Sequence, residues 1–208
     1  AYNLSRTSNI TESDYIGEST IIDWIWKKEI DSLGSQSSRF IQSFSEKQAQ
    51  KLSTSIPVSD FSISELSPLD KLKESKVFIE IEDRLYLTHD LFGDWARYKL
   101  IRANKGNLKP FLLSKDLFSP LWCKAVRLYG IYLLENNNDA SEWLTLFNSL
   151  EISESNEKII QDLLLESIIF SVDIFSHLTV LWDLFNQNNG ELFNRFLGQF
   201  LLKATLPN

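Results

Sequence analysis

His89 and Asp90 are the residues of this sequence whose types and positions point most directly to chemistry. An imidazole can donate a hydrogen bond to a phosphate, and it changes its protonation near neutral pH. The pair stands where an alternating apolar pattern over residues 84–88 gives way to helical spacing, which predicts a corner between a strand and a helix. Aspartate is a favoured N-cap because its carboxylate accepts unpaired backbone N–H groups. The pattern therefore predicts Asp90 as the N-cap and His89 beside a helix N-terminus, where anions are favoured.

A β-hairpin and a helix must position this corner. Two apolar stretches, residues 77–81 and 84–87, flank Glu82-Asp83 and predict two short strands with a tight turn between them. After the corner, a helix is expected from Asp90 to about Ala103. Its apolar side consists of Leu91, Phe92, Trp95, Ala96 and Leu100.

Three further helices are expected before the hairpin. The first covers residues 19–33 and ends near Gly34, since glycine suits a left-handed C-cap. The second covers residues 37–52 and the third residues 68–75. Their inward-facing residues are expected to be Phe40, Ile41, Phe44, Leu52, Leu69 and Leu72. The order of three helices, a hairpin and a helix is typical of a winged-helix domain, which we expect over residues 19–106.

The rest of the chain, residues 107–208, is expected to be an α-helical domain, so the fold class is mainly α. Apolar spacing predicts five helices, over residues 117–133, 141–150, 154–171, 176–186 and 192–201. Paired helices suggest a bundle, a sensor region or the start of a helical repeat, although no fixed repeat period is present. The last helix carries one continuous apolar stripe: Leu192, Phe193, Phe196, Leu197, Phe200 and Leu201.

Composition excludes several classes of protein. The chain has 208 residues, 43% hydrophobic residues and a net charge of −7, so it can bury a core but repels phosphate backbones. Nucleic acid and membrane are therefore not expected partners, and residues 1–18 are expected to be a polar lead-in. A single cysteine and the absence of a signal peptide favour a cytoplasmic location. The absence of methionine suggests a piece of a longer protein.

The sequence offers no active site of its own. It lacks a phosphate-binding loop, and two histidines with one cysteine do not supply a zinc site. Cys123 is expected to be a buried, inert thiol, and His177 a capping or buried, hydrogen-bonded side chain. Several carboxylates are assigned to turns, caps or the solvated hairpin: Asp14, Asp60, Asp173, Glu80, Glu82 and Asp83. We expect no catalysis and no metal.

The segment Tyr-Leu-Thr-His-Asp-Leu-Phe-Gly-Asp-Trp-Ala, which begins at Tyr86, resembles the MHD-type signature of STAND NTPases. These are signalling and defence ATPases with NB-ARC or NACHT modules. Their signature has an apolar residue, His, Asp and Leu, followed by an aromatic residue and Ala along the last winged-helix helix. Thr88 stands where plant members usually have Met, a departure common in bacterial members. The resemblance covers roughly residues 20–105.

The resemblance implies a nucleotide sensor. In the family, the motif histidine contacts the β-phosphate of ADP held by the upstream NTPase module, and the aspartate caps the helix and orients that histidine. Carried onto this chain, His89 would be the sensor and Asp90 its support. ADP or ATP with Mg is then expected only in the longer protein. The expected partners are its NTPase module and, after exchange for ATP, other copies of the same protein.

Other functions fit parts of the pattern. A winged-helix DNA-binding regulator would use Lys71, Lys73 and Lys76, but its hairpin would be acidic where a DNA-binding wing needs Arg or Lys. A helical interaction scaffold would bind its partner through Phe193, Phe196 and Phe200. Without the resemblance, Asp90 is simply a cap and His89 a corner residue. An independent enzyme fits least.

Overall fold

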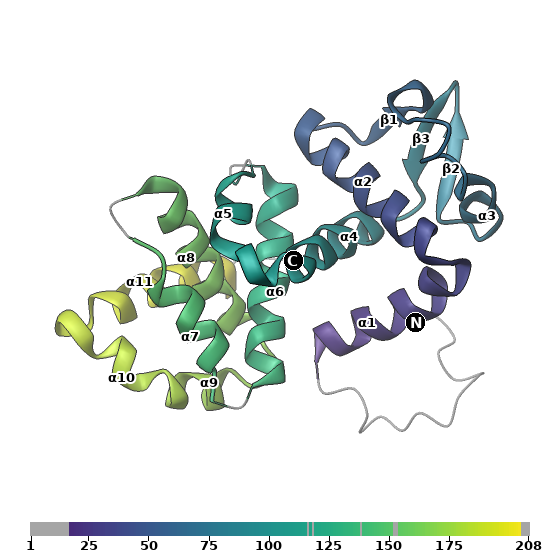
Figure 1. Cartoon of the computed structure of the whole chain (residues 1–208). Helices are drawn as coiled ribbons and strands as arrows, with labels where there is room; N and C mark the ends of the chain where they lie inside the picture. Colours follow the sequence, from purple (N-terminus) through teal and green to yellow (C-terminus); the bar gives the residue numbers. More distant parts are fainter. Residues whose placement is uncertain (1–16, 116, 118, 138, 152–153, 205–208) are drawn as a thin grey trace, which may run out of the picture.

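The computed structural model describes residues 17–204 apart from residues 116, 118, 138, 152 and 153. Within these residues the chain is mainly helical, with one small three-stranded antiparallel sheet (Figure 1). Most of the predicted lead-in, and with it Asp14, lies outside the described residues. None of the described helices combines the length and apolar composition that a membrane crossing requires.

The first two helices lie where the sequence predicts them. Helix α1 (Glu18–Glu29) is followed by a 3₁₀ turn, η3 (Asp31–Leu33), and by helix α2 (Ser35–Lys51). Gly34 has φ 105°, the left-handed region that glycine adopts without strain. Leu52 was expected to face inward, and this is wrong. It adopts the left-handed C-cap conformation of α2, which turns its side chain to solvent.

The hairpin is confirmed. Strands β2 (Phe78–Ile81) and β3 (Arg84–Leu87) pair antiparallel around Glu82 and Asp83, whose φ values of 51° and 57° fit the twist of a two-residue hairpin. A third strand was not predicted. It is β1 (Ser55–Pro57), which pairs with β3 and gives the order β1-β3-β2.

The stretch between β1 and the hairpin holds short helices. They are the 3₁₀ turn η4 (Val58–Asp60) and helix α3 (Leu69–Glu74). As predicted, Leu69 and Leu72 are buried. An aromatic cluster joins this segment to α2 and β2, with ring centroids 4.8 to 6.1 Å apart: Phe40, Phe44, Phe61 and Phe78.

Helix α4 (Asp90–Ala103) connects the sheet to the remaining helices. It is followed by η5 (Lys105–Asn107), α5 (Leu108–Leu113) and α6 (Pro120–Asn136). Helix α6 packs against both α1 and α4, and buried apolar residues from both halves of the chain form one core. The division near residue 106 into two domains stays a prediction.

The C-terminal helices follow in sequence, and α8 packs against α6. They are α7 (Ser141–Asn148), α8 (Ser155–Ile169), α9 (Ile174–Val180), α10 (Trp182–Phe185), the 3₁₀ turn η6 (Gln187–Gly190) and α11 (Glu191–Ala204). The single helix expected over residues 176–186 is wrong, because the chain breaks between α9 and α10 at the buried Leu181.

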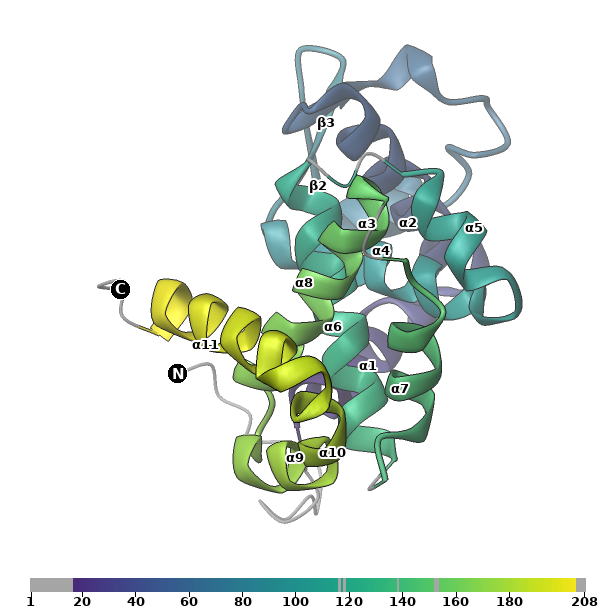
Figure 2. The same ribbon diagram turned by 90° about the vertical axis from the view of Figure 1, so that its left-hand side faces the viewer.

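Helix α11 runs along one flank of the molecule (Figure 2). Its apolar stripe is only partly used in packing. Phe196 is buried among aromatic neighbours, whereas Leu197 and Phe200 of the stripe are 39% and 36% exposed, and Leu202 beside the stripe is 63% exposed. The distal half of α11 therefore offers an apolar face to solvent.

Candidate functional site

The link between β3 and α4 is a firmly held corner. The backbone N–H of Thr88 donates to the carbonyl of Val77 at 3.0 Å, and its Oγ1 donates to the carbonyl of Lys76 at 2.6 Å. These bonds tie the end of β3 to the start of β2. The next residue, His89, is therefore presented from a fixed backbone.

His89, and not Asp90, is the N-cap of α4. His89 has an extended backbone, its carbonyl accepts the N–H of Phe92 at 3.1 Å, and its Nδ1 accepts the N–H of Leu91 at 3.4 Å. The predicted cap was therefore wrong by one residue, because the extended conformation of β3 continues through His89. Asp90 is the first helical residue, where a negative charge is favoured by the helix dipole.

The capping contact sets the chemistry of the imidazole. Nδ1 can accept the Leu91 N–H only if it carries no proton, so a neutral ring holds its proton on Nε2. The side chains of His89 and Asp90 are both exposed. The corner thus offers an Nε2–H donor to solvent beside a helix N-terminus, an arrangement that suits an anionic oxygen.

A buried ion pair that the sequence analysis missed lies one turn further along α4. Asp94 Oδ1 accepts from Arg97 Nη2 at 2.9 Å, and both side chains are nearly inaccessible. Arg97 also donates to the carbonyls of Ser45 on α2 and Leu121 on α6, each at 3.1 Å. Desolvation lowers the pKa of Arg97, and Asp94 opposes this shift. Lys124 of α6 pairs with the second oxygen of Asp94.

An apolar hollow lies close to the corner. It has a volume of about 360 Å³ and is lined by α1, α4 and the segment after α8, with Ile21, Leu91, Trp95 and Val172 among its walls. Leu91, whose backbone N–H donates to His89 Nδ1, is one of the residues that line this hollow. It could accept an apolar side chain of a partner that contacts the corner.

The remaining predicted residues have structural roles. Asp173 is the N-cap of α9, as expected, and hydrogen bonds from Ser176 hold its pKa below the usual value. His177 lies inside α9 and is neither a cap nor fully buried, and desolvation lowers its pKa. Cys123 is half-buried and donates to the carbonyl of Leu117. Burial raises the Cys123 pKa, which disfavours the reactive thiolate.

One carboxylate of the hairpin, Glu80, forms an ion pair with one lysine of α3, Lys73. Lys73 contacts Glu80 at 2.9 Å and Asp70 at 3.7 Å. Asp60 pairs with Lys51 at 2.5 Å, as a turn residue can. Among the described residues, no group of three or more His, Cys, Asp or Glu side chains is placed to hold a metal ion.

Comparisons with known protein families, with curated protein sequences and with solved structures find no match for this chain.

Proposed function

We propose that this chain is a regulatory part of a STAND-type signalling or defence NTPase. Its first half would be the winged-helix domain. The corner between β3 and α4 would contact the nucleotide that is bound by the NTPase module of the longer protein. His89 would contact the β-phosphate of bound ADP and so favour the closed, inactive state. The chain itself would carry out no catalysis.

The observation that supports this function best is the position of His89. Its exposed ring is fixed at Nδ1 by the Leu91 N–H, which leaves Nε2–H as a donor beside the N-terminus of α4. A phosphate oxygen is a suitable acceptor, and the helix dipole adds a favourable field. Asp90 would support the sensor by stabilising the first turn of α4 rather than by capping it.

The arrangement of the first half supports a winged-helix assignment. Helices α2 and α3 precede the hairpin, and β1 adds a third strand beside β3, so a small sheet lies next to the helices. The hairpin leads directly into α4, which is where the family signature is expected to lie. Exchange of ADP for ATP would break the contact between His89 and the nucleotide. The two nucleotides would then favour different states of the protein, because a ligand shifts the populations of two states only if its contacts differ between them.

A helical interaction scaffold remains the second candidate. The exposed apolar side chains of Leu197, Phe200 and Leu202 on α11 support it, since such a face usually marks a contact with another protein. In this alternative a partner would bind α11, and the corner at His89 would have no ligand. The two candidates differ in which substitutions abolish function.

The proposed function is tested on the longer protein that contains this chain, purified without added nucleotide. Bound nucleotide is released and identified for the wild type, for His89→Ala and for His177→Ala, which removes the only other histidine of the chain. We expect ADP in the wild type and in His177→Ala. Loss of the phosphate contact should make ADP exchange on the order of tenfold faster in His89→Ala.

Two results would contradict the proposal. The first is the absence of nucleotide from all three proteins. The second is the same ADP content and the same exchange rate in His89→Ala and His177→Ala. Either would leave the scaffold as the better account, and charged substitutions at Phe200 and Leu202 would then be used to test α11.

A further inference from the structure

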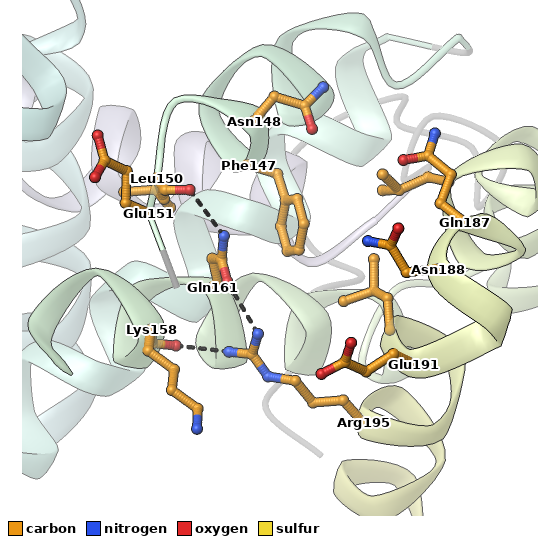
Figure 3. Close-up of a pocket in the computed structure, with 12 residues that line it drawn as sticks. Phe147, Asn148, Leu150, Glu151, Lys158, Gln161, Gln187, Asn188, Glu191 and Arg195 are labelled. Carbon is orange, nitrogen blue, oxygen red and sulfur yellow. Dashed lines mark hydrogen bonds between the residues drawn. The ribbon is translucent and has the colours of Figure 1, made fainter. Parts of the chain in front are cut away.

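A second hollow, far along the chain from His89, has the size and lining of a ligand site. It lies between the end of α7, the start of α8, the η6 turn and the first turns of α11, and its volume is about 500 Å³ (Figure 3). Its apolar lining consists of Phe147, Leu150, Leu184 and Leu192. Pockets for small ligands usually combine such a lining with a few directed polar groups.

Arg195 forms one wall of this hollow and is held by three hydrogen bonds to α8. Its Nε donates to Asp162 at 2.6 Å, its Nη1 to Gln161 Oε1 at 2.9 Å, and its Nη2 to the carbonyl of Lys158 at 2.9 Å. Gln161 is itself buried and donates to the carbonyl of Leu150 at 3.1 Å. Asp162 therefore neutralises the charge of Arg195. The guanidinium is held in place and forms part of the wall of the hollow.

Asn188 and Glu191 enter the hollow from the opposite side and point toward Phe147 and Arg195 (Figure 3). Neither side chain makes a hydrogen bond or an ion pair with another described residue. Asn188 has φ 50° and ψ 48°, and Asn189 and Gly190 also have positive φ. Asparagine adopts the left-handed region more readily than most other residues, so this turn can hold Asn188 over the hollow.

The charges that face the hollow define the ligand. Glu191 supplies a carboxylate without a partner among the described residues, whereas Arg195 is already compensated. The ammonium group of Lys158 points away from the hollow (Figure 3). A cation would pair with Glu191, and the amide oxygen of Asn188 could accept one of its N–H groups.

We propose that this hollow binds a primary ammonium or guanidinium group carried on an apolar chain. The cation would contact Glu191 and Asn188, and the apolar chain would lie against Phe147 and the leucines. Two sources share this chemistry: an Arg or Lys side chain of a peptide, and a free alkyl amine or guanidine. The site is independent of the nucleotide contact proposed for His89.

The test titrates the full 208-residue chain with three probes, followed by calorimetry and by NMR shifts of the lining residues. The probes are butylguanidine, acetyl-Leu-Arg-amide and the uncharged acetyl-Leu-Gln-amide. We expect saturable binding of the two cations and none of the neutral peptide. Tighter binding of the peptide assigns a peptide source, and tighter binding of butylguanidine assigns a free guanidine.

Two variants and one control separate binding from folding. Glu191→Gln keeps the shape and should weaken cation binding about tenfold, because it removes a charge-assisted hydrogen bond. Asn188→Gly keeps the left-handed turn and should weaken binding about threefold. Glu74→Gln, on the exposed side of α3, should bind as the wild type does. Equal affinity of Glu191→Gln and wild type, equal binding of the neutral peptide, or no saturable binding at millimolar concentration overturns the proposal.

Discussion

Replacing Gly130 by Ala tests a close approach between helices α6 and α8. Gly130 lies on α6 where α8 crosses, and an added Cβ would stand 2.6 Å from the Cβ and Oγ of Ser167 and 3.2 Å from a methyl of Leu164. Non-bonded carbon atoms prefer separations of about 3.5–4.0 Å. Because Ser167 Oγ accepts the indole N–H of Trp143 at 3.2 Å, it cannot move without disturbing that bond.

The expected magnitude follows from two opposing effects. Alanine in a helix interior is favoured over glycine by about 1 kcal/mol. Overpacking a core contact costs about 1–3 kcal/mol. The net expectation is a loss of about 0–2 kcal/mol in the free energy of unfolding relative to the wild type, which lowers the melting temperature of a chain of this size by up to about 8 °C.

Gly198→Ala is the matched control, because Gly198 also lies inside a helix but has no heavy atom within 4 Å of an added Cβ. This variant should gain about 1 kcal/mol from helix propensity alone. Both variants are compared by thermal and urea unfolding followed by circular dichroism. Equal stabilities of Gly130→Ala and Gly198→Ala would refute the close contact.

A double-mutant cycle then asks whether the loss arises at Ser167. Ser167→Gly removes both atoms that meet the new Cβ, so the double variant should lose less stability than the sum of the two single variants. The cycle is informative even though Ser167→Gly is itself destabilising, since only the departure from additivity is used. A strictly additive cycle would place the cause elsewhere.

Three further predictions concern charged and titratable groups. Long-range proton–nitrogen NMR should find the neutral His89 ring protonated on Nε2, and a proton on Nδ1 would disprove the cap at Leu91. Asp94→Asn should lose about 3 kcal/mol or more because it leaves a buried guanidinium uncompensated, whereas Asp70→Asn, at a side chain 92% exposed, should change the unfolding free energy by about 0–1 kcal/mol. Desolvation raises the pKa of Glu18 above 4.5, opposed by a nearby arginine. The folded state then binds this proton more tightly than the unfolded state does, so stability falls as the pH rises above 4.5. Because Glu18 is exposed, Glu18→Gln should raise the melting temperature only slightly at neutral pH and not at all below pH 4.5.

Local sequence patterns were sufficient to predict the β2–β3 hairpin and helix α4. Glu82-Asp83 is not a preferred turn pair, yet the apolar stretches on both sides fixed the pairing that the structure has. Strand β1 could not be predicted in this way, because it has three residues and ends in Pro57. It is held by Arg84, whose Nε and Nη2 donate to Ser55 at 2.8 and 3.0 Å, a contact across 29 residues.

The buried pair on α4 shows a different limit of periodicity. A hydrophobic pattern assigns charged residues to solvent, so Asp94 and Arg97 were not expected in the core. Their spacing of three residues allows them to pair on one helix face. What makes burial possible is the set of acceptors and donors on α2 and α6, and a one-dimensional pattern contains no information about these partners.

Helix α4 unites these observations. The exposed ring of His89 caps its N-terminus, and its second turn contacts α2 through Arg97 and α6 through Arg97 and Asp94. A displacement of this segment from α2 and α6 would uncover the buried Asp94–Arg97 pair, which is strongly unfavourable. If His89 contacts a nucleotide as proposed, we expect α2, α4 and α6 to move together as a rigid unit. In that case we expect the relative motion between the corner and the nucleotide-binding module, and not within the described core.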